Sequence, residues 1–236
     1  MTNEIPAPAS VSDKLAALGP YFAVEFHGAS QEPEAPWRPM TELVDEPAVM
    51  QERVAGVRAF LAAGTGREAA AVELRVAASV VHLGLVARVT SPLLALAVEY
   101  GWRGSVRAAD LWWQPGLAST FPLSISETVL GAGEAGTGGF LSELEAVIAE
   151  FGVNRHILRG NVGSALAGAS RMLAGDAESR VLAEMIGSPE LVGCGELHDG
   201  VFRRRSCCLI YRAAPARDGS LCGDCVLAHV GRVRAA

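Results

Sequence analysis

The sequence is poor in lysine, in aromatic residues and in long uncharged apolar runs. Lys14 is the only lysine among 20 basic residues, and aromatic residues make up 6% of the 236 positions. The first 20 residues lack the basic region and the apolar stretch of a secretory leader. The most apolar run, residues 76–98, is interrupted by His82, Arg88 and Pro92, and its uncharged pieces are too short to cross a bilayer. We therefore expect a cytoplasmic protein with no membrane span.

Charge and cysteine content exclude further classes. The formal net charge is −6, the sequence pI is near 5.4, and no aromatic residues are interleaved with the arginines, so a nucleic-acid partner is not expected. Hydrophobic residues make up 50% of the chain, which excludes disorder as a description of the whole. Five cysteines are too few for a disulfide scaffold, and in a reducing compartment clustered cysteines favour a metal over disulfides.

Hydrophobic spacing predicts a mainly α (α+β) fold, with a helical, bundle-like body and a few short strands. We expect short strands at residues 21–27 and between residues 105 and 126. Ser91-Pro92 is expected to begin a new helix, because proline is favoured in a first helical turn. The predicted helical segments are residues 46–63, 68–90, 92–100, 140–151, 154–173 and 176–186. The predicted domains are a helical body, residues 1–195, and a cysteine-bearing C-terminal region, residues 196–236.

Two patterns in the body carry little chemistry. Residues 131–136 read G-x-G-x-x-G, but no buried strand leads directly into them and helices follow, so a loop between helices is the better interpretation than a dinucleotide site. The five histidines are scattered without an H-x-x-x-H pair, and no G-x-S-x-G occurs. His82 is expected to be a hydrogen-bonded core residue.

Four of the five cysteines lie within nineteen positions near the C-terminus. They form a vicinal pair, Cys207 and Cys208, and a C-x-x-C pair, Cys222 and Cys225, separated by thirteen residues. A C-x-x-C turn places two thiolates on one side of a tight loop. Four thiolates suit a structural zinc ion or a [2Fe–2S] cluster. Adjacent cysteines diverge, which favours two bridged irons over one tetrahedral ion; zinc and free thiols remain as alternatives.

The cysteines lie in a basic surrounding. Residues 201–236 contain seven arginines and two aspartates, a net charge of +5, whereas residues 1–200 carry −11. Positive charge beside a cluster raises its reduction potential and attracts anionic partners. The candidate tuning or docking residues are Arg203, Arg204, Arg205 and Arg212. The alternative is a solvated basic surface with no partner.

The motif R-S-C-C-L-I-Y-R of residues 205–212, followed by L-C-G-D-C-V-L of residues 221–227, resembles the C-terminal motif of FhuF-type ferric-siderophore reductases. Residues 159–166 also resemble a G-N-x-x-S/A-A helix start of that family. The resemblance is specific over about 20 residues, fair over residues 155–227 and weak in the N-terminal half. The family spacer is usually about ten residues, against thirteen here; three more loop residues cost little closure entropy.

The resemblance implies that Cys207, Cys208, Cys222 and Cys225 bind a [2Fe–2S] cluster that reduces ferric siderophores, most often hydroxamates, in the cytoplasm. A ferredoxin-like or flavin-dependent protein would donate the electrons, and no catalytic residue beyond the cluster is expected. Cys194 has no counterpart among the ligands. Two rival functions remain: a redox or iron sensor that carries the same cluster without turnover, and a non-catalytic domain stapled by zinc.

Overall fold

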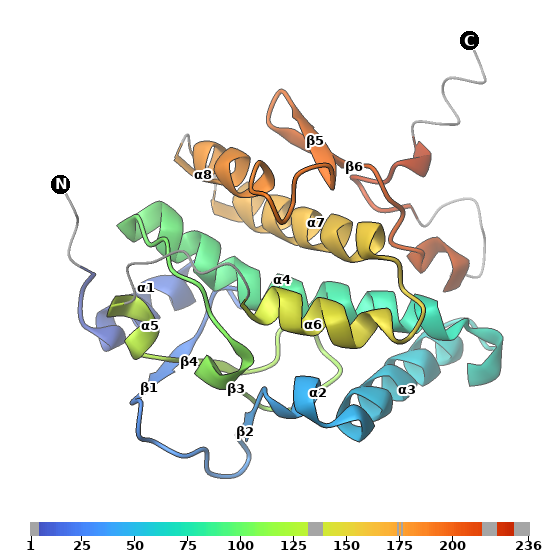
Figure 1. Ribbon diagram of the computed structural model, residues 1–236, viewed down its shortest axis with the longest axis horizontal. Coiled ribbons are helices and arrows are strands. Elements are labelled where there is room, and N and C mark those ends of the chain that lie inside the picture. Colours follow the sequence, from blue (N-terminus) through green and yellow to red (C-terminus); the bar gives the residue numbers. More distant parts are fainter. Residues whose placement is uncertain (1–4, 132–138, 174, 176, 214–220, 229–236) are drawn as a thin grey trace.

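The computed structural model describes residues 5–131, 139–173, 175, 177–213 and 221–228. These residues form eight α-helices and six short strands, which confirms the mainly α (α+β) fold class (Figure 1). The α-helices are α1 Pro8–Ala17, α2 Glu42–Asp45, α3 Pro47–Ala63, α4 Leu74–Tyr100, α5 Thr128–Gly131, α6 Phe140–Ala149, α7 Arg155–Leu173 and α8 Ala177–Ile186. Three short 3-10 turns are η1 Ala69–Ala71, η2 Ala108–Asp110 and η3 Ile210–Ala213.

Helix α4 is the centre of the molecule. It runs across the middle of Figure 1 with α7 along one side, α6 in front and α3 at one end, and it packs most extensively against α7. A helix that is apolar all round is stable only when it is surrounded by other elements, and most α4 side chains are buried. Its length and apolarity alone would also allow a membrane span, but 78% of its most apolar window is buried inside the structure.

Pro92 does not begin a helix, which corrects the sequence prediction: it lies inside α4. Proline cannot donate to the carbonyl four residues before it and costs about 3 kcal/mol in a helix interior. The neighbouring hydroxyls supply hydrogen bonds in this turn, from Thr90 Oγ1 to Val86 O at 2.7 Å and from Ser91 Oγ to Ala87 O at 2.6 Å. Packing of this segment on all sides therefore outweighs the local preference for a break.

Residues 25–126 contribute a small mixed sheet below α4. Its strands are β1 Glu25–His27, β2 Arg38–Pro39, β3 Leu111–Trp113 and β4 Leu123–Ser126, in the order β1-β4-β3-β2 with β1 parallel to β4. Buried Arg88 of α4 attaches to the segments around this sheet, donating to Phe121 O at 2.7 Å and Tyr21 O at 3.0 Å. The strands expected in residues 21–27 and 105–126 are thus present, though shorter.

Four other helices agree with the sequence to within a few residues. Helices α3, α6, α7 and α8 begin and end close to the predicted bounds, because each carries a local repeat of apolar residues and an end marked by glycine or proline. Of the G-x-G-x-x-G segment, only Gly131 lies within the described residues, at the end of α5.

The sequence did not predict the hairpin that leads into the cysteines. Strands β5 Gly195–His198 and β6 Val201–Arg204 pair antiparallel around an Asp199-Gly200 turn. Buried Phe202 belongs to the same hydrophobic core as α4 and α7, and the hairpin lies over α7 (Figure 1). The predicted domain boundary at residues 195/196 falls at the start of β5.

Candidate metal centre

The two cysteine pairs come from segments that follow the hairpin. Cys207 and Cys208 lie between β6 and η3, and Cys222 and Cys225 lie in the turn that closes the described part of the chain. Cys208 and Cys225 are buried, whereas Cys207 and Cys222 are half-buried. Most of the spacer between the pairs, residues 214–220, lies outside the described residues.

One sulfur of each pair meets the other across the spacer. Cys208 Sγ and Cys222 Sγ are 3.7 Å apart, far longer than a disulfide bond of about 2.05 Å. Two thiolates bound to one tetrahedral ion at about 2.3 Å lie about 3.8 Å from each other. The observed separation therefore matches two ligands of one ion, either zinc or one iron of a cluster.

Among the residues that the structure describes, no three or more His, Cys, Asp or Glu side chains are grouped to hold a metal ion. Cys207 Sγ instead accepts a hydrogen bond from the Leu209 amide at 3.3 Å. This tight turn needs the left-handed conformation of Leu209, at φ 69°, which is strained for a residue with a Cβ. The vicinal pair is further held by Ser79 Oγ of α4, which donates to Cys208 O at 2.9 Å.

The local environment separates the pKa values of the thiols. The hydrogen bond from the Cys222 thiol, aided by the Ile210 amide and the charge of Arg204, lowers the pKa of Cys208 to about 6 despite its burial. The same contact raises the pKa of Cys222, since its proton is shared with Cys208. Burial raises the pKa of Cys207 and of Cys194. Cys208 is thus more readily ionised than Cys194, Cys207 or Cys222, and a metal ligand must be ionised.

Arg204 is the buried cation of this region. Its side chain is 2% exposed, and Nη2 donates to Asn161 Oδ1 at 2.7 Å and to Ile157 O at 3.3 Å. Its Nε and Nη1 have no hydrogen-bond partner among the described residues, and it forms no ion pair there. A buried charge is costly unless an opposite charge compensates it. Arg204 therefore fits a site that carries net negative charge, as four thiolates and a cluster would supply.

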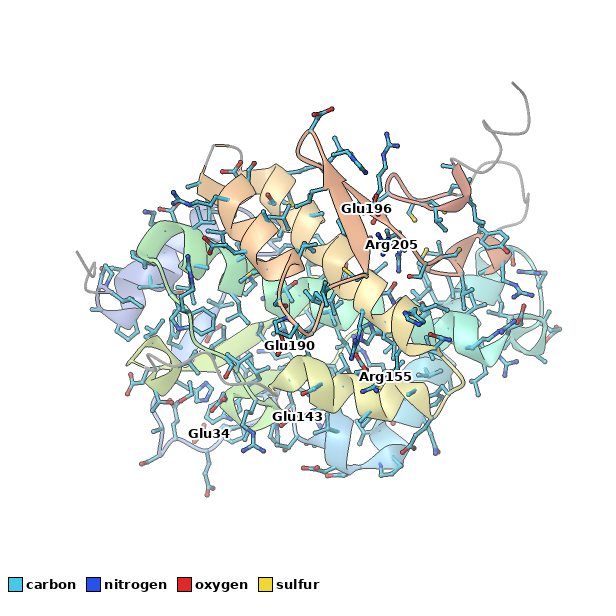
Figure 2. The ribbon with its side chains drawn as sticks, turned by 45° about the horizontal axis from the view of Figure 1, so that its top comes forward. Glu34, Glu143, Arg155, Glu190, Glu196 and Arg205 are labelled. Atoms are coloured by element: carbon cyan, nitrogen blue, oxygen red, sulfur yellow. The ribbon has the colours of Figure 1, made fainter. Side chains whose placement is uncertain are left out.

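The other three candidate arginines differ from Arg204 in burial and partners. Arg203 is exposed on the opposite face of β6. Arg205 pairs with Glu196 of β5, and Figure 2 shows the two side by side on the hairpin. Arg212 Nη2 pairs with Glu73 Oε1 at 2.8 Å. These three are surface charges, and ion pairs of this kind contribute little to stability.

Helix α7 supplies residues that the sequence analysis did not single out as partners of Arg204. Asn161 Nδ2 donates to Ser79 O at 3.1 Å and lies 3.4 Å from His82 Nδ1. A Cβ on Gly160 would lie 2.9 Å from Arg204 Nη2, so only glycine permits this approach. The G-N motif at residues 160–161 thus lies inside α7, beyond its first turn. His82 is a buried core residue as predicted, and its Nε2 has no partner in the described part.

The C-x-x-C turn is fastened to the same elements. Arg204 N donates to Asp224 O at 3.2 Å, and Ser164 Oγ of α7 donates to the Asp224 carboxylate. Cys225 N donates to Cys222 O at 3.0 Å and closes the turn. Cys194 is buried beside Gly163, where a Cβ would lie 3.0 Å from its Sγ. It therefore belongs to the packing of α7, and no contact of its sulfur with the four other cysteine sulfurs is present in the described residues.

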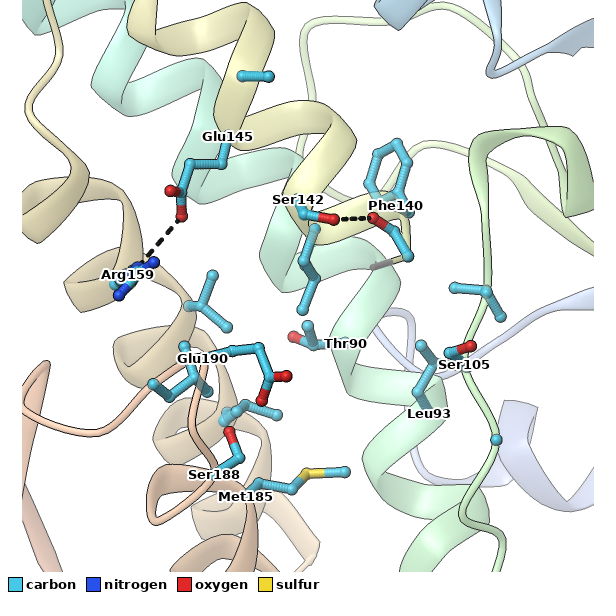
Figure 3. Close-up of a pocket in the computed structure, with 18 of the residues that line it drawn as sticks. Thr90, Leu93, Ser105, Phe140, Ser142, Glu145, Arg159, Met185, Ser188 and Glu190 are labelled. Atoms are coloured by element: carbon cyan, nitrogen blue, oxygen red, sulfur yellow. Dashed lines mark hydrogen bonds and ion pairs between the residues drawn. The ribbon is translucent and has the colours of Figure 1, made fainter. Parts of the chain in front are cut away.

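A separate cavity of about 560 Å³ opens on the other side of α7. Figure 3 shows Thr90 and Leu93 of α4 facing Met185 and Glu190 from the α8 side across this space. Trp102 is buried and also lines the cavity. Trp112 and Trp113 lie in β3 of the sheet.

Comparison with known proteins adds no assignment: no family model and no curated protein matches this chain.

Proposed function

We propose that Cys207, Cys208, Cys222 and Cys225 bind a [2Fe–2S] cluster, and that the protein is a cytoplasmic one-electron reductase of ferric siderophore complexes. The observation that carries the proposal is the 3.7 Å approach of Cys208 and Cys222 beside Arg204, a buried cation that forms no ion pair among the described residues. Four cysteine thiolates are the usual ligand set of such a cluster. The motif resemblance to FhuF-type reductases supplies the activity.

The chemistry of the substrate explains why one electron is sufficient. Hard oxygen donors of a siderophore bind Fe(III) much more tightly than Fe(II). The proposed reaction takes one electron from an external protein donor and converts chelated Fe(III) to Fe(II), with no bond of the chelator broken. When bound, a [2Fe–2S] cluster supplies a carrier of single electrons.

The chain's own residues would bind and tune that carrier. The Leu209 and Ile210 amides donate hydrogen bonds to the sulfurs of Cys207 and Cys208, and such bonds to ligand sulfur raise a cluster's reduction potential. The positive charge of Arg204 acts in the same direction. Asn161 fixes its guanidinium group by a 2.7 Å hydrogen bond. Together these groups would stabilise the more negative, reduced state.

The exposed arginines suit an acidic electron donor. Arg203 points away from the core on β6, and Arg205 and Arg212 lie at the surface with one carboxylate partner each. Positive surface patches accelerate association with acidic proteins in a salt-dependent manner. We propose a ferredoxin-like or flavin-dependent donor on this side.

Anaerobic purification of the full chain tests the cofactor. We expect coloured protein with about two irons and two sulfides per chain, and a paramagnetic signal after reduction with dithionite. Cys225→Ser should lose the colour, whereas the control Cys194→Ala should keep it. Colourless protein with one zinc ion would overturn the cluster and favour the zinc-stapled domain.

A second measurement tests the reaction. Reduced protein is mixed with a ferric trihydroxamate in a stopped-flow spectrometer. We expect the protein to be reoxidised within the time of one catalytic turnover, and the Fe(II) that is formed to be trapped by a colorimetric chelator. A cluster that is present but is not reoxidised by the chelate would contradict the reductase and indicate a sensor.

A further inference from the structure

The cavity described above is large enough for a small-molecule site. Its volume of about 560 Å³ lies within the range of about 300–1,000 Å³ found for ligand pockets. Its walls come from α4, the segment after α4, α6, α7 and the end of α8 (Figure 3). The large apolar side chains in these walls include Leu93, Trp102, Phe140, Leu141, Leu166 and Met185.

Helix α7 lies between this cavity and the segments that carry the cysteines. Arg159, Val162 and Leu166 line the cavity, whereas Gly160 and Ser164 contact the segments that carry the cysteines. These residues lie on two sides of one helix, whose full diameter is about 10–12 Å. The two sites are therefore neighbours, one on each side of α7.

A short loop provides a second connection between the cavity and the hairpin. Leu191 lines the cavity, and its carbonyl accepts a hydrogen bond from Cys194 N at 2.9 Å. The Cys194 carbonyl in turn accepts from Arg205 N at 2.9 Å, two residues before Cys207. The wall of the cavity is thus fixed relative to the vicinal cysteines by backbone hydrogen bonds.

The charges at the cavity balance. Its four charged residues are Glu145, Arg155, Arg159 and Glu190, which sum to zero. Glu145 pairs with Arg155 at 2.6 Å and with Arg159 at 3.5 Å. In the described residues the hydroxyls of Ser105 and Ser188 make no hydrogen bond within the protein and are available to a ligand. Apolar walls with few polar groups suit a ligand of low net charge that carries methylene chains.

We propose that this cavity binds the ferric chelate, as a complex of low net charge with apolar linkers, across α7 from the cysteines. The proposal rests on the reductase function and gives the substrate a location. A chelate with three net negative charges would meet the carboxylates of Glu145 and Glu190 without a matching excess of cations. Such a mismatch discriminates between ligands.

A redox-inert probe separates this proposal from the function. Ga³⁺ has the charge of Fe³⁺ and is not reduced, so binding of a gallium trihydroxamate can be measured by isothermal titration calorimetry with the full chain. We expect binding that Ala146→Trp weakens at least tenfold, because Ala146 is an exposed cavity residue whose enlargement fills the space. Ala55 is an exposed residue of α3 outside the cavity, so Ala55→Trp should bind the gallium complex like the unmodified protein.

Three further results decide the assignment. Ala149→Trp should reproduce the loss, and circular dichroism should show that both variants are folded. Cys225→Ser should retain gallium binding, so failure of the cluster and failure of the cavity are distinguishable. A gallium tricatecholate should bind at least tenfold more weakly. Undiminished binding in folded Ala146→Trp and Ala149→Trp would overturn the site, and equal binding of both complexes would overturn the ligand class.

Discussion

Gly160 of α7 and Ser206, just before the vicinal cysteines, are packed so closely that no side chain fits between them. A Cβ on Gly160 would collide with Ser206 Oγ and would lie 2.9 Å from Arg204 Nη2. Ser206 Oγ also donates to His156 O at 2.7 Å, which fixes it to the start of α7. The positions of the Ser206 and Arg204 side chains beside the vicinal cysteines therefore depend on the absence of a methyl group at position 160.

We expect Gly160→Ala to lower both stability and metal content, since the added methyl group must displace the Ser206 hydroxyl and the Arg204 guanidinium group from their hydrogen bonds to His156 O and Asn161 Oδ1. Overpacking of this kind costs about 1–3 kcal/mol, measurable by urea unfolding, and iron per chain should fall in parallel. Gly168→Ala is the matched control. Gly168 lies on the same helix, and a Cβ added there would have no atom within 4 Å, so the higher helix propensity of alanine should stabilise the protein by up to about 1 kcal/mol. Equal behaviour of the two variants would refute the contact.

Removal of the Arg204 charge should lower the reduction potential of the metal centre. A unit charge about 8 Å from another contributes about 2 kcal/mol at an effective dielectric constant of about 20, so we expect Arg204→Met to shift a one-electron potential down by ~50–100 mV. Arg203→Met, on the exposed face of the same strand, should shift it much less. Redox titration followed by absorbance measures both; a larger shift in Arg203→Met would argue against the buried cation as the tuning charge.

Acid should destabilise the protein through His82. Burial, aided by the charge of Arg204, lowers the pKa of His82 to about 3 from 6.5. The native state therefore holds the His82 ring in its neutral form. The contribution of His82 to stability is complete above the pKa of histidine in the unfolded chain, and it is lost as the pH falls toward the lower pKa of His82 in the folded protein. Between pH 7 and pH 5 this loss amounts to about 2 kcal/mol. Urea unfolding of His82→Gln should show a smaller loss over that interval; an identical loss would show that other groups are responsible.

The β5–β6 turn should require glycine at position 200. Asp199 and Gly200 both have positive φ, at 50° and 75°, as a two-residue type I′ hairpin demands. Gly200→Ala should cost about 1 kcal/mol of unfolding free energy, because the left-handed conformation strains a residue with a Cβ. Gly116→Ala, where φ is not in this region and no neighbour is close, should change stability little. Thermal unfolding of the two variants tests the difference.

Local pattern determined much of this protein. The apolar spacing and the terminal glycines and prolines of α3, α6, α7 and α8 are properties of neighbouring residues, and so is the C-C and C-x-x-C pattern. These features could be read from the sequence because a helix face and a tight cysteine turn depend on residues only a few positions apart. The mainly α (α+β) class follows from the same regularity.

Contacts between distant segments decided the rest. Burial on all sides carries α4 through Pro92, and packing of Phe202 against Gly163 places the hairpin. The tertiary structure alone distinguishes buried Arg204 from its exposed neighbours, brings Cys208 to Cys222 across the spacer, and forms the cavity beside them. Each depends on which surfaces exclude water when helices far apart in sequence pack together, and a one-dimensional pattern does not contain that information.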